Sequence, residues 1–169
     1  DGGIVITDDG KLYTTSDGSP DAIYELDINT GDVSLVANSG PWSDLEGYVA
    51  IAPDGDLVIP DAGTDAVYKV DPNTGNASTF ISESQIMAIT GDSGADLQGG
   101  IGFDADGNFY IAEEDSDGVI KFPADDSADG IDIAGGTFLA SATQIEAVTG
   151  VDADLEGGIT FSTLQTESE

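Results

Sequence analysis

Four copies of one short motif recur along this 169-residue chain. The copies are Asp1-Gly2-Gly3-Ile4, Glu46-Gly47-Tyr48-Val49, Gln98-Gly99-Gly100-Ile101 and Glu156-Gly157-Gly158-Ile159. In the first three, another glycine follows eight residues after the first, and these later glycines (Gly10, Gly55 and Gly107) lie 45 and 52 residues apart. A repeat of this length with several short strands is typical of a β-propeller, in which each repeat forms one blade.

Each of the three full repeats contains four runs of strand-forming residues separated by turn sequences. The predicted strands are Ile4–Thr7, Leu12–Thr15, Ala22–Leu26, Val33–Ala37, Val49–Ala52, Leu57–Pro60, Ala66–Val70, Ser78–Ile81, Ile101–Asp104, Phe109–Ala112, Val119–Phe122 and Thr137–Ala140. Asp-Gly pairs between neighbouring runs predict tight hairpins, because glycine readily adopts the positive φ that such turns need. We therefore expect an all-β propeller built from four-stranded antiparallel blades.

Two segments that follow the fourth strands share the pattern Gln-Ile-x-Ala-Ile/Val-Thr-Gly. Ser84–Gly91 and Thr143–Gly150 both have serine upstream and end in glycine, which predicts a short helix between one blade and the next. In the first repeat, residues 38–43 replace this segment. We expect Trp42 there to pack at a blade junction rather than to stack against a ligand.

The blade count leaves the predicted ring open. We interpret the chain as one partial propeller, with blade 1 at residues 1–44, blade 2 at 45–96, blade 3 at 97–154, and an extra strand (Ile159–Ser162) and tail at 155–169. A closed propeller has at least four blades, and open strand edges promote pairing. Three explanations remain: a processed or excised piece of a longer propeller, a homodimer that completes a ring of about six blades, or a larger assembly.

The charge of the chain restricts its partners and its compartment. Thirty-four acidic residues against three lysines (Lys11, Lys69 and Lys121) give a net charge of −31. Such a field repels nucleic acid and anionic membrane surfaces, and no apolar run is long enough for a transmembrane helix. We therefore expect no nucleic-acid partner and no membrane insertion. The acidity and the turn-rich repeats predict a secreted protein, with the charge acting as a solubilising surface or as a cation-binding one.

Residue types that are missing exclude several chemistries. The chain has no cysteine and no histidine. Disulfides, thiolate metal sites, and Ser-His-Asp or Cys-His catalytic arrangements are therefore impossible. No glycine-rich phosphate loop with its lysine is present either. A pair of carboxylates or a metal-activated water would still be compatible with the sequence, although no particular pair stands out.

An acidic or amide residue precedes the glycine of every motif copy. This position lies at the entrance of the predicted innermost strand, where a propeller presents side chains to its channel. Asp1, Glu46, Gln98 and Glu156 occupy it in successive repeats, and an aspartate stands two residues earlier in three of them. The candidate metal ligands are Glu46, Gln98, Glu156, Asp44, Asp96 and Asp154. Converging carboxylate and amide oxygens suit Ca²⁺, so the pattern predicts a calcium site. The alternative is that these side chains hydrogen-bond backbone amides between neighbouring blades.

A second group of acids follows the second strands. Glu113, Glu114 and Asp115 come after the second strand of the third repeat, at the position of Asp61 in the second repeat and Ser16-Asp17 in the first. These residues either flank a site on one face or lie in a solvated loop. Asp104–Asn108 has the composition of a calcium loop but lacks the terminal glutamate, so we predict a hairpin turn there.

Residues 100–112 (Gly-Ile-Gly-Phe-Asp-Ala-Asp-Gly-Asn-Phe-Tyr-Ile-Ala) resemble the start of an NHL propeller repeat. Residues 118–122 (Gly-Val-Ile-Lys-Phe) resemble the later Arg-Ile-x-Lys-Phe strand of that family, and weaker copies cover residues 47–70 and 2–26. The Asp-Leu-Glu-Gly sequences at 44–47 and 154–157 are also similar to a Glu-Gly motif of six-bladed gluconolactonase-like propellers. That second resemblance implies a glutamate ligand to a divalent metal over the channel. This chain lacks the family's Glu-Gly-Pro tripeptide, and the family's Asn and Asp ligands have no match here.

These observations lead to one expectation and two alternatives for the function. We expect a secreted, acidic, calcium-associated propeller module for binding or assembly, with a second copy of itself or another propeller segment as partner. The first alternative is a metal-dependent hydrolase or lactonase of the gluconolactonase-like kind. The second is a structural subunit of an extracellular filament or layer. Because one fold hosts many activities, the repeats are evidence of architecture rather than of chemistry.

Overall fold

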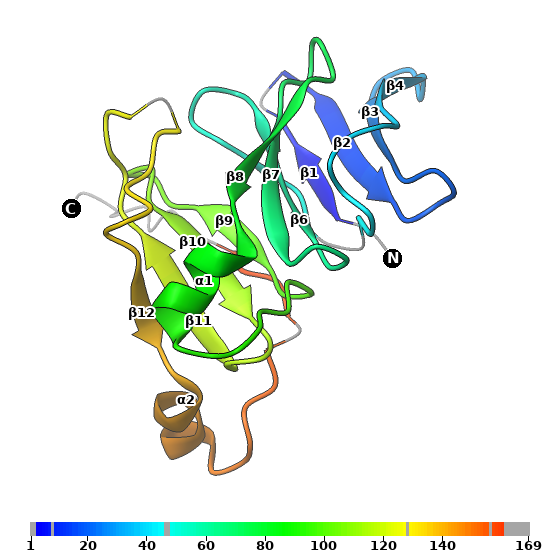
Figure 1. The fold of residues 1–169 in the computed structure, drawn as a ribbon. Coiled ribbons are helices and arrows are strands. Elements are labelled where there is room, and N and C mark those ends of the chain that lie inside the picture. Colours follow the sequence, from blue (N-terminus) through cyan, green and yellow to red (C-terminus); the bar gives the residue numbers. More distant parts are fainter. Residues whose placement is uncertain (1–2, 8, 46–47, 128, 156, 161–169) are drawn as a thin grey trace, which may run out of the picture.

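The computed structural model describes residues 3–7, 9–45, 48–127, 129–155 and 157–160, and it contains three four-stranded antiparallel sheets. The first sheet consists of β1 (Ile4–Ile6), β2 (Lys11–Ser16), β3 (Ala22–Asp27) and β4 (Val33–Ala37); the second of β5 (Ala50–Ile51), β6 (Leu57–Asp61), β7 (Ala66–Val70) and β8 (Ala77–Ile81); the third of β9 (Ile101–Phe103), β10 (Phe109–Glu113), β11 (Gly118–Phe122) and β12 (Thr137–Ala140). Within each sheet the strands pair in chain order, and the sheets follow one another as blades 1, 2 and 3 (Figure 1). The predicted fold of four-stranded blades is confirmed.

Two short helices follow blades 2 and 3, as predicted. They are α1 (Glu83–Thr90) and α2 (Ala142–Thr149). Each begins after a serine whose backbone N–H donates to a glutamine side chain three residues later, and each ends at a glycine in the left-handed region. Neither helix has the length and hydropathy needed to cross a bilayer, so the described residues contain no candidate membrane span.

Each blade has two faces, because side chains alternate across a strand. In blades 2 and 3, we call the face turned toward the preceding blade the front face and the opposite one the back face. In blade 1, the face that packs on blade 2 is the back face, and the other one is the front face. The front face of blade 2 packs against the back face of blade 1 in one apolar cluster. This cluster contains Tyr13, Ile23 and Ala37 from blade 1 and Val49, Leu57, Ile59 and Val70 from blade 2. Trp42 packs against the same cluster, with its ring 6.3 Å from that of Tyr68, so it is a packing residue as predicted.

The junction between blades 2 and 3 repeats this arrangement. The back face of blade 2 contributes Ala50, Val58, Val67 and Ile81, and the front face of blade 3 contributes Ile101, Phe109, Ile111, Ile120 and Phe122. All of these side chains are buried. The core of the molecule is therefore a series of equivalent face-to-face junctions, and apolar burial of this kind is the main stabilising term of the fold.

The recurring motif brings the starts of the innermost strands close together. A Cβ atom added to Gly3 would lie 2.5 Å from Cα of Tyr48, and one added to Gly100 would lie 2.3 Å from the backbone nitrogen of Ile159. The N–H of Gly100 donates to the carbonyl of Gly157 over 2.9 Å. Close backbone approach thus explains glycine at positions 3 and 100. In the predicted strand at 159–162, residues 159 and 160 are not in a strand and the other two lie outside the described residues.

Candidate functional site

The structure directs attention to two carboxylates inside the blades. Asp61 and Glu113 are the last residues of β6 and β10, and both side chains are fully buried. For these two residues, the interpretation as part of a solvated loop is wrong. Each second strand runs one residue further than predicted, and this places the carboxylate in the interior of its blade.

Asp61 joins the connection between blades 1 and 2 to a hairpin of blade 2. One carboxylate oxygen accepts the backbone N–H groups of Ser43 and Asp44 over 3.0 and 2.6 Å. The other accepts the backbone N–H and the hydroxyl of Thr64 over 2.9 and 2.5 Å. The carbonyl of Asp44 in turn accepts the N–H of Ala62. Asp61 therefore fastens the connection that enters the innermost strand to the β6–β7 hairpin.

Glu113 has the same role in blade 3. Its carboxylate accepts the N–H of Asp96 over 2.8 Å, and the N–H of Ser116 over 2.9 Å together with the Ser116 hydroxyl. The carbonyl of Asp96 accepts the N–H of Glu114. Because a buried carboxylate is tolerated only when hydrogen bonds replace its hydration, the recurrence of this arrangement identifies Asp61 and Glu113 as structural groups.

The predicted ligands do not form a metal centre in the described part of the chain. Asp44 and Asp96 are half-buried, and their backbone N–H groups are bound as above. Gln98 is exposed and donates to Asp96 over 3.2 Å, and Asp154 is exposed. Glu46 and Glu156 lie outside the described residues. Within the described ranges, no three acidic side chains are grouped so that they could hold a metal ion.

The alternative prediction is that the motif side chains hydrogen-bond backbone amides. Carboxylate–amide hydrogen bonds do occur at the motif, but the carboxylates belong to the second strands. Asp44 and Asp96 supply the N–H groups, and Asp61 and Glu113 supply the oxygens. One signal in the sequence could have indicated this, namely an acid at the equivalent end of two second strands. The other missed feature is the motif leucine, since Leu45 and Leu97 are fully buried anchors.

Acidic side chains crowd the end of the blades that carries the β6–β7 and β10–β11 hairpins. Burial and the charges of Asp96, Glu83 and Asp115 raise the pKa of Asp65 to about 6. Burial and the charges of Asp21, Asp61 and Asp17 also raise the pKa of Asp44. Both shifts have the same origin, because a carboxylate near other carboxylates and partly removed from water is harder to ionise.

Asp65→Asn is expected to stabilise the protein at neutral pH. The folded-state pKa of Asp65 lies above its unfolded value of 3.8, so ionisation of this group lowers the free energy of unfolding as the pH rises from about 4 to 6. Because the side chain is partly solvated, the gain from Asn is about 1 kcal/mol at pH 7, and it disappears near pH 4. Urea unfolding at several pH values measures this difference.

Asp117→Asn is the matched control for Asp65→Asn. Asp117 holds the equivalent place in the next blade, with φ of 45° against 49° at Asp65. Asparagine tolerates this left-handed conformation, so both substitutions change the backbone preference in the same way. If Asp117→Asn stabilised the protein as much as Asp65→Asn, with the same pH dependence, the electrostatic explanation would be wrong.

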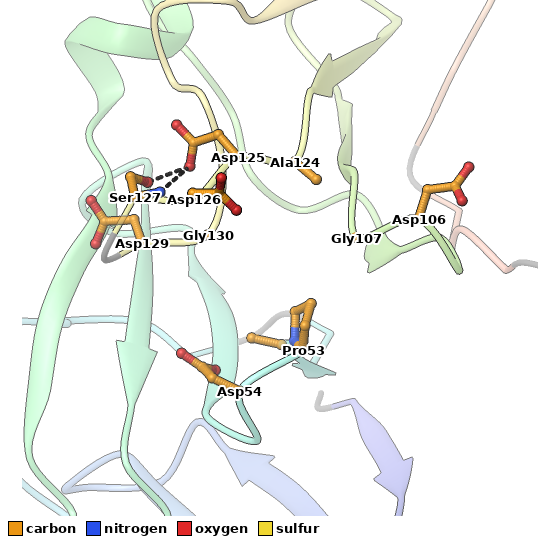
Figure 2. Close-up of a pocket in the computed structure, with 11 residues that line it drawn as sticks. Pro53, Asp54, Asp106, Gly107, Ala124, Asp125, Asp126, Ser127, Asp129 and Gly130 are labelled. Carbon is orange, nitrogen blue, oxygen red and sulfur yellow. Dashed lines mark hydrogen bonds between the residues drawn. The ribbon is translucent and has the colours of Figure 1, made fainter.

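A hollow of about 500 Å³ lies between blades 2 and 3 at their other end, where the β5–β6 and β9–β10 turns meet the loop after β11. Its carboxylates are those of Asp54, Asp106, Asp125, Asp126 and Asp129. Figure 2 shows Asp125, Asp126 and Asp129 together in one loop, with Asp106 apart from them. Asp54 is already held by Lys69 at 2.5 Å, and Asp125 accepts from Ser127. These contacts describe an acidic surface hollow rather than an assembled catalytic site.

Comparisons with solved structures support the fold. The chain is similar to virginiamycin B lyase from Staphylococcus aureus (14% identity, TM-score 0.56, 82% of this chain and 40% of that one). It is similar to a putative gluconolactonase (17% identity, TM-score 0.55, 83% and 48%) and to regucalcin, a calcium-binding protein from Agrobacterium tumefaciens (22% identity, TM-score 0.51, 77% and 42%). No protein-family model matches the sequence, and no curated protein matches it.

These similarities concern architecture. The solved structures are six-bladed propellers, and this chain spans less than half the length of each of the three. At identities of 14 to 22%, the similarity shows the fold alone. The expected likeness to gluconolactonase-like propellers is thus confirmed for the fold, and the three blades of this chain correspond to part of a six-bladed ring.

Proposed function

We propose that this chain is a secreted, acidic module for binding or assembly that completes its propeller ring with another propeller segment. One observation carries the proposal: the front face of blade 1 is exposed, whereas the equivalent faces of blades 2 and 3 are buried. Ile4 is 65% exposed, but Val49 and Ile101 at the same register position are 7% and 5% exposed. Leu12 is half-buried where Leu57 and Phe109 are fully buried.

The exposed face has the composition of a blade junction. Besides Ile4 and Leu12 it carries Ile6, Tyr24, Leu26, Val33 and Leu35, which the strand registers place on the same side of the sheet. Contiguous apolar surface of this kind is typical of an interaction site, because its exposure to water is unfavourable. The back face of another blade is the surface that covers the equivalent residues elsewhere in the molecule.

Leu35→Asp is expected to reduce assembly of the protein in solution. The measurement is sedimentation velocity over a range of protein concentrations, with the 17.2 kDa monomer as reference. Ile28→Asp is the matched control, because Ile28 is also 53% exposed but lies in the β3–β4 turn, outside the apolar face. If both variants assembled to the same extent, the front face of blade 1 would not be the assembly surface.

Calcium association is the second part of the proposal. Its support is the net charge of −31 and the crowding that raises the pKa of Asp65 to about 6. A divalent cation near such carboxylates would offset their mutual repulsion. The regucalcin that resembles this chain in fold is described as a calcium-binding protein. The described residues offer no built ligand set, so the proposal concerns association with the acidic surface and the motif acids.

Millimolar Ca²⁺ is expected to raise the melting temperature. A cation bound at about a hundred times its dissociation constant contributes about 2.7 kcal/mol, which corresponds to roughly 5–10 °C for a chain of this size. Calorimetry with Ca²⁺, with chelator, and with NaCl of equal ionic strength measures the effect. Asp96→Asn should reduce it, and Asp92→Asn, at an exposed position outside the motif, should not. Equal midpoints in Ca²⁺ and in matched NaCl would exclude calcium association.

The lactonase alternative requires several oxygen ligands around one cation beside a substrate pocket. Among the described residues, which do not include Glu46 and Glu156, no three acidic side chains are grouped to hold a metal ion. A lactonase assay on the chain loaded with Ca²⁺ remains the direct check. Metal-dependent turnover that is lost in Asp96→Asn with the fold retained would replace the binding proposal by the enzymatic one.

A further inference from the structure

The two ends of the blade series carry complementary halves of one junction. At the N-terminal end, the front face of blade 1 is exposed, as described above. At the C-terminal end, the back face of blade 3 is more accessible than the back face of blade 1 at equivalent positions. Tyr110 and Val119 are partly exposed, whereas Tyr13 and Ile23 are 4% and 0% exposed. Among the described residues, blade 1 thus carries an exposed front face and blade 3 a partly exposed back face.

Helix α2 shows the same lack of a neighbour in the described chain. In α1, Ile86 is fully buried, and Ile89 reaches Gly136, directly before strand β12 of the next blade. A Cβ atom added to Gly136 would lie 2.5 Å from Cδ1 of Ile89. The equivalent residues of α2 are Ile145, which is partly exposed, and Val148, which is 88% exposed. Since α1 and α2 share their sequence pattern, α2 presents an apolar side suited to the fourth strand of a following blade.

Blade 1 presents a fourth strand of that kind. Leu35 of β4 pairs with Tyr24, just as Phe138 of β12 pairs with Ile120. Phe138 packs against the cluster that contains Ile86, whereas Leu35 is 53% exposed. Leu35 is therefore the equivalent of Phe138. If blade 1 followed α2 as blade 3 follows α1, α2 would contact Leu35.

We propose that a second copy of this chain covers these faces, so that blade 1 of each copy packs on blade 3 and α2 of the other. This inference rests on the proposed assembly function and names its partner. Twice three blades make six, the number in the solved propellers that resemble this chain. A head-to-tail contact that closes after two copies produces a twofold ring without free faces, which is the stable outcome for a heterologous interface.

The innermost position of the new junction has two candidate strands. Residues 157–159 lie against Gly100, at the place that an innermost strand of a following blade would take. In the proposed ring, β1 of the second copy belongs at the same place. The two segments share the motif Gly-Gly-Ile, so either one can fill the position with the same close backbone contacts.

The charge of the chain predicts how this association depends on salt. Two copies that each carry −31 repel one another, and salt screens this repulsion while the apolar contact is unaffected or strengthened. The dimer should therefore tighten as the NaCl concentration rises. An interface held by ion pairs would weaken under the same conditions.

Thiol cross-linking tests the arrangement directly, because the chain has no cysteine of its own. Val148→Cys and Leu35→Cys are prepared as separate proteins, mixed in high salt, and treated with a short thiol-specific cross-linker. The expected product is a heterodimer that joins Cys at 148 of one copy to Cys at 35 of the other. Ile28→Cys replaces Leu35→Cys in the control mixture and should give at least tenfold less product. In sedimentation equilibrium the unlinked protein should reach a dimer and no larger species.

The outcomes separate this inference from the assembly function on which it rests. If Leu35→Cys cross-linked only to itself, two front faces would meet. The proposed assembly function would then be supported, and the head-to-tail ring would be wrong. Species that grow beyond a dimer with concentration would replace the closed ring by an open filament. A chain that stays monomeric at every concentration and salt would overturn the second-copy partner. If Leu35→Asp weakened the association constant by less than about tenfold, the front face of blade 1 would not be the assembly surface.

Discussion

Asp61→Ala is expected to lower the free energy of unfolding by about 3–4 kcal/mol. The substitution removes the acceptor of four part-buried hydrogen bonds, which come from the N–H groups of Ser43, Asp44 and Thr64 and from the Thr64 hydroxyl. Each buried donor without an acceptor costs about 1–3 kcal/mol, partly offset where water enters the space left by the carboxylate. Urea unfolding followed by circular dichroism measures the loss.

Two control variants isolate the hydrogen bonds from the charge. Asp106→Ala removes the same charge from an exposed turn residue and should change the stability by less than about 0.5 kcal/mol. Glu113→Ala tests the equivalent carboxylate of blade 3 and should cost a similar amount as Asp61→Ala, because Asp96 and Ser116 lose their acceptor. If Asp61→Ala were as mild as Asp106→Ala, Asp61 would not fasten the hairpin.

The sequence predicts the blades well because their determinants are local. Alternating apolar residues define the strands, and Asp-Gly turns between them, as at Asp54-Gly55 and Asp106-Gly107, define the hairpins. Gly55 and Gly107 have φ of 94° and 83°, which is the conformation for which glycine is needed. Serine upstream and glycine at the end likewise define both helices. Each of these features depends on a few neighbouring residues, so no long-range information is required.

The candidate site is predicted less well, because burial is a property of the folded molecule. The sequence shows Asp44 and Asp61 as acids near turns, and nothing local tells which one is buried. The deciding factor is which carboxylate finds backbone N–H groups 17 or 18 residues away, as Asp61 does at Asp44 and Ser43. Side chains without such donors stay exposed, as those of Gln98 and Asp154 do. The place of a residue in the motif therefore predicts its position in the backbone but not the contacts of its side chain.

Phe109→Ala is expected to have the largest effect of any substitution considered, a loss of about 3–5 kcal/mol. Phe109 is fully buried at the junction of blades 2 and 3, with its ring centroid 4.7 Å from that of Phe103, 5.4 Å from Phe80 and 6.2 Å from Phe122. Alanine would leave a cavity lined by three rings that cannot all move to fill it. Chemical denaturation measures the loss in the free energy of unfolding. An unchanged m-value shows that Phe109→Ala and the unsubstituted protein unfold from the same compact state.

Leu12→Ala is the control for Phe109→Ala, and its behaviour depends on what covers blade 1. Leu12 occupies the register position of Phe109, but on the exposed front face, where it is only half-buried. In dilute protein at low salt the substitution should therefore cost less than about 1 kcal/mol, because little apolar area is withdrawn from contact. At high concentration in high salt the cost should approach the 2–5 kcal/mol of a core leucine, since a second blade then buries the side chain. A cost that stayed small under both conditions would mean that no blade packs on this face.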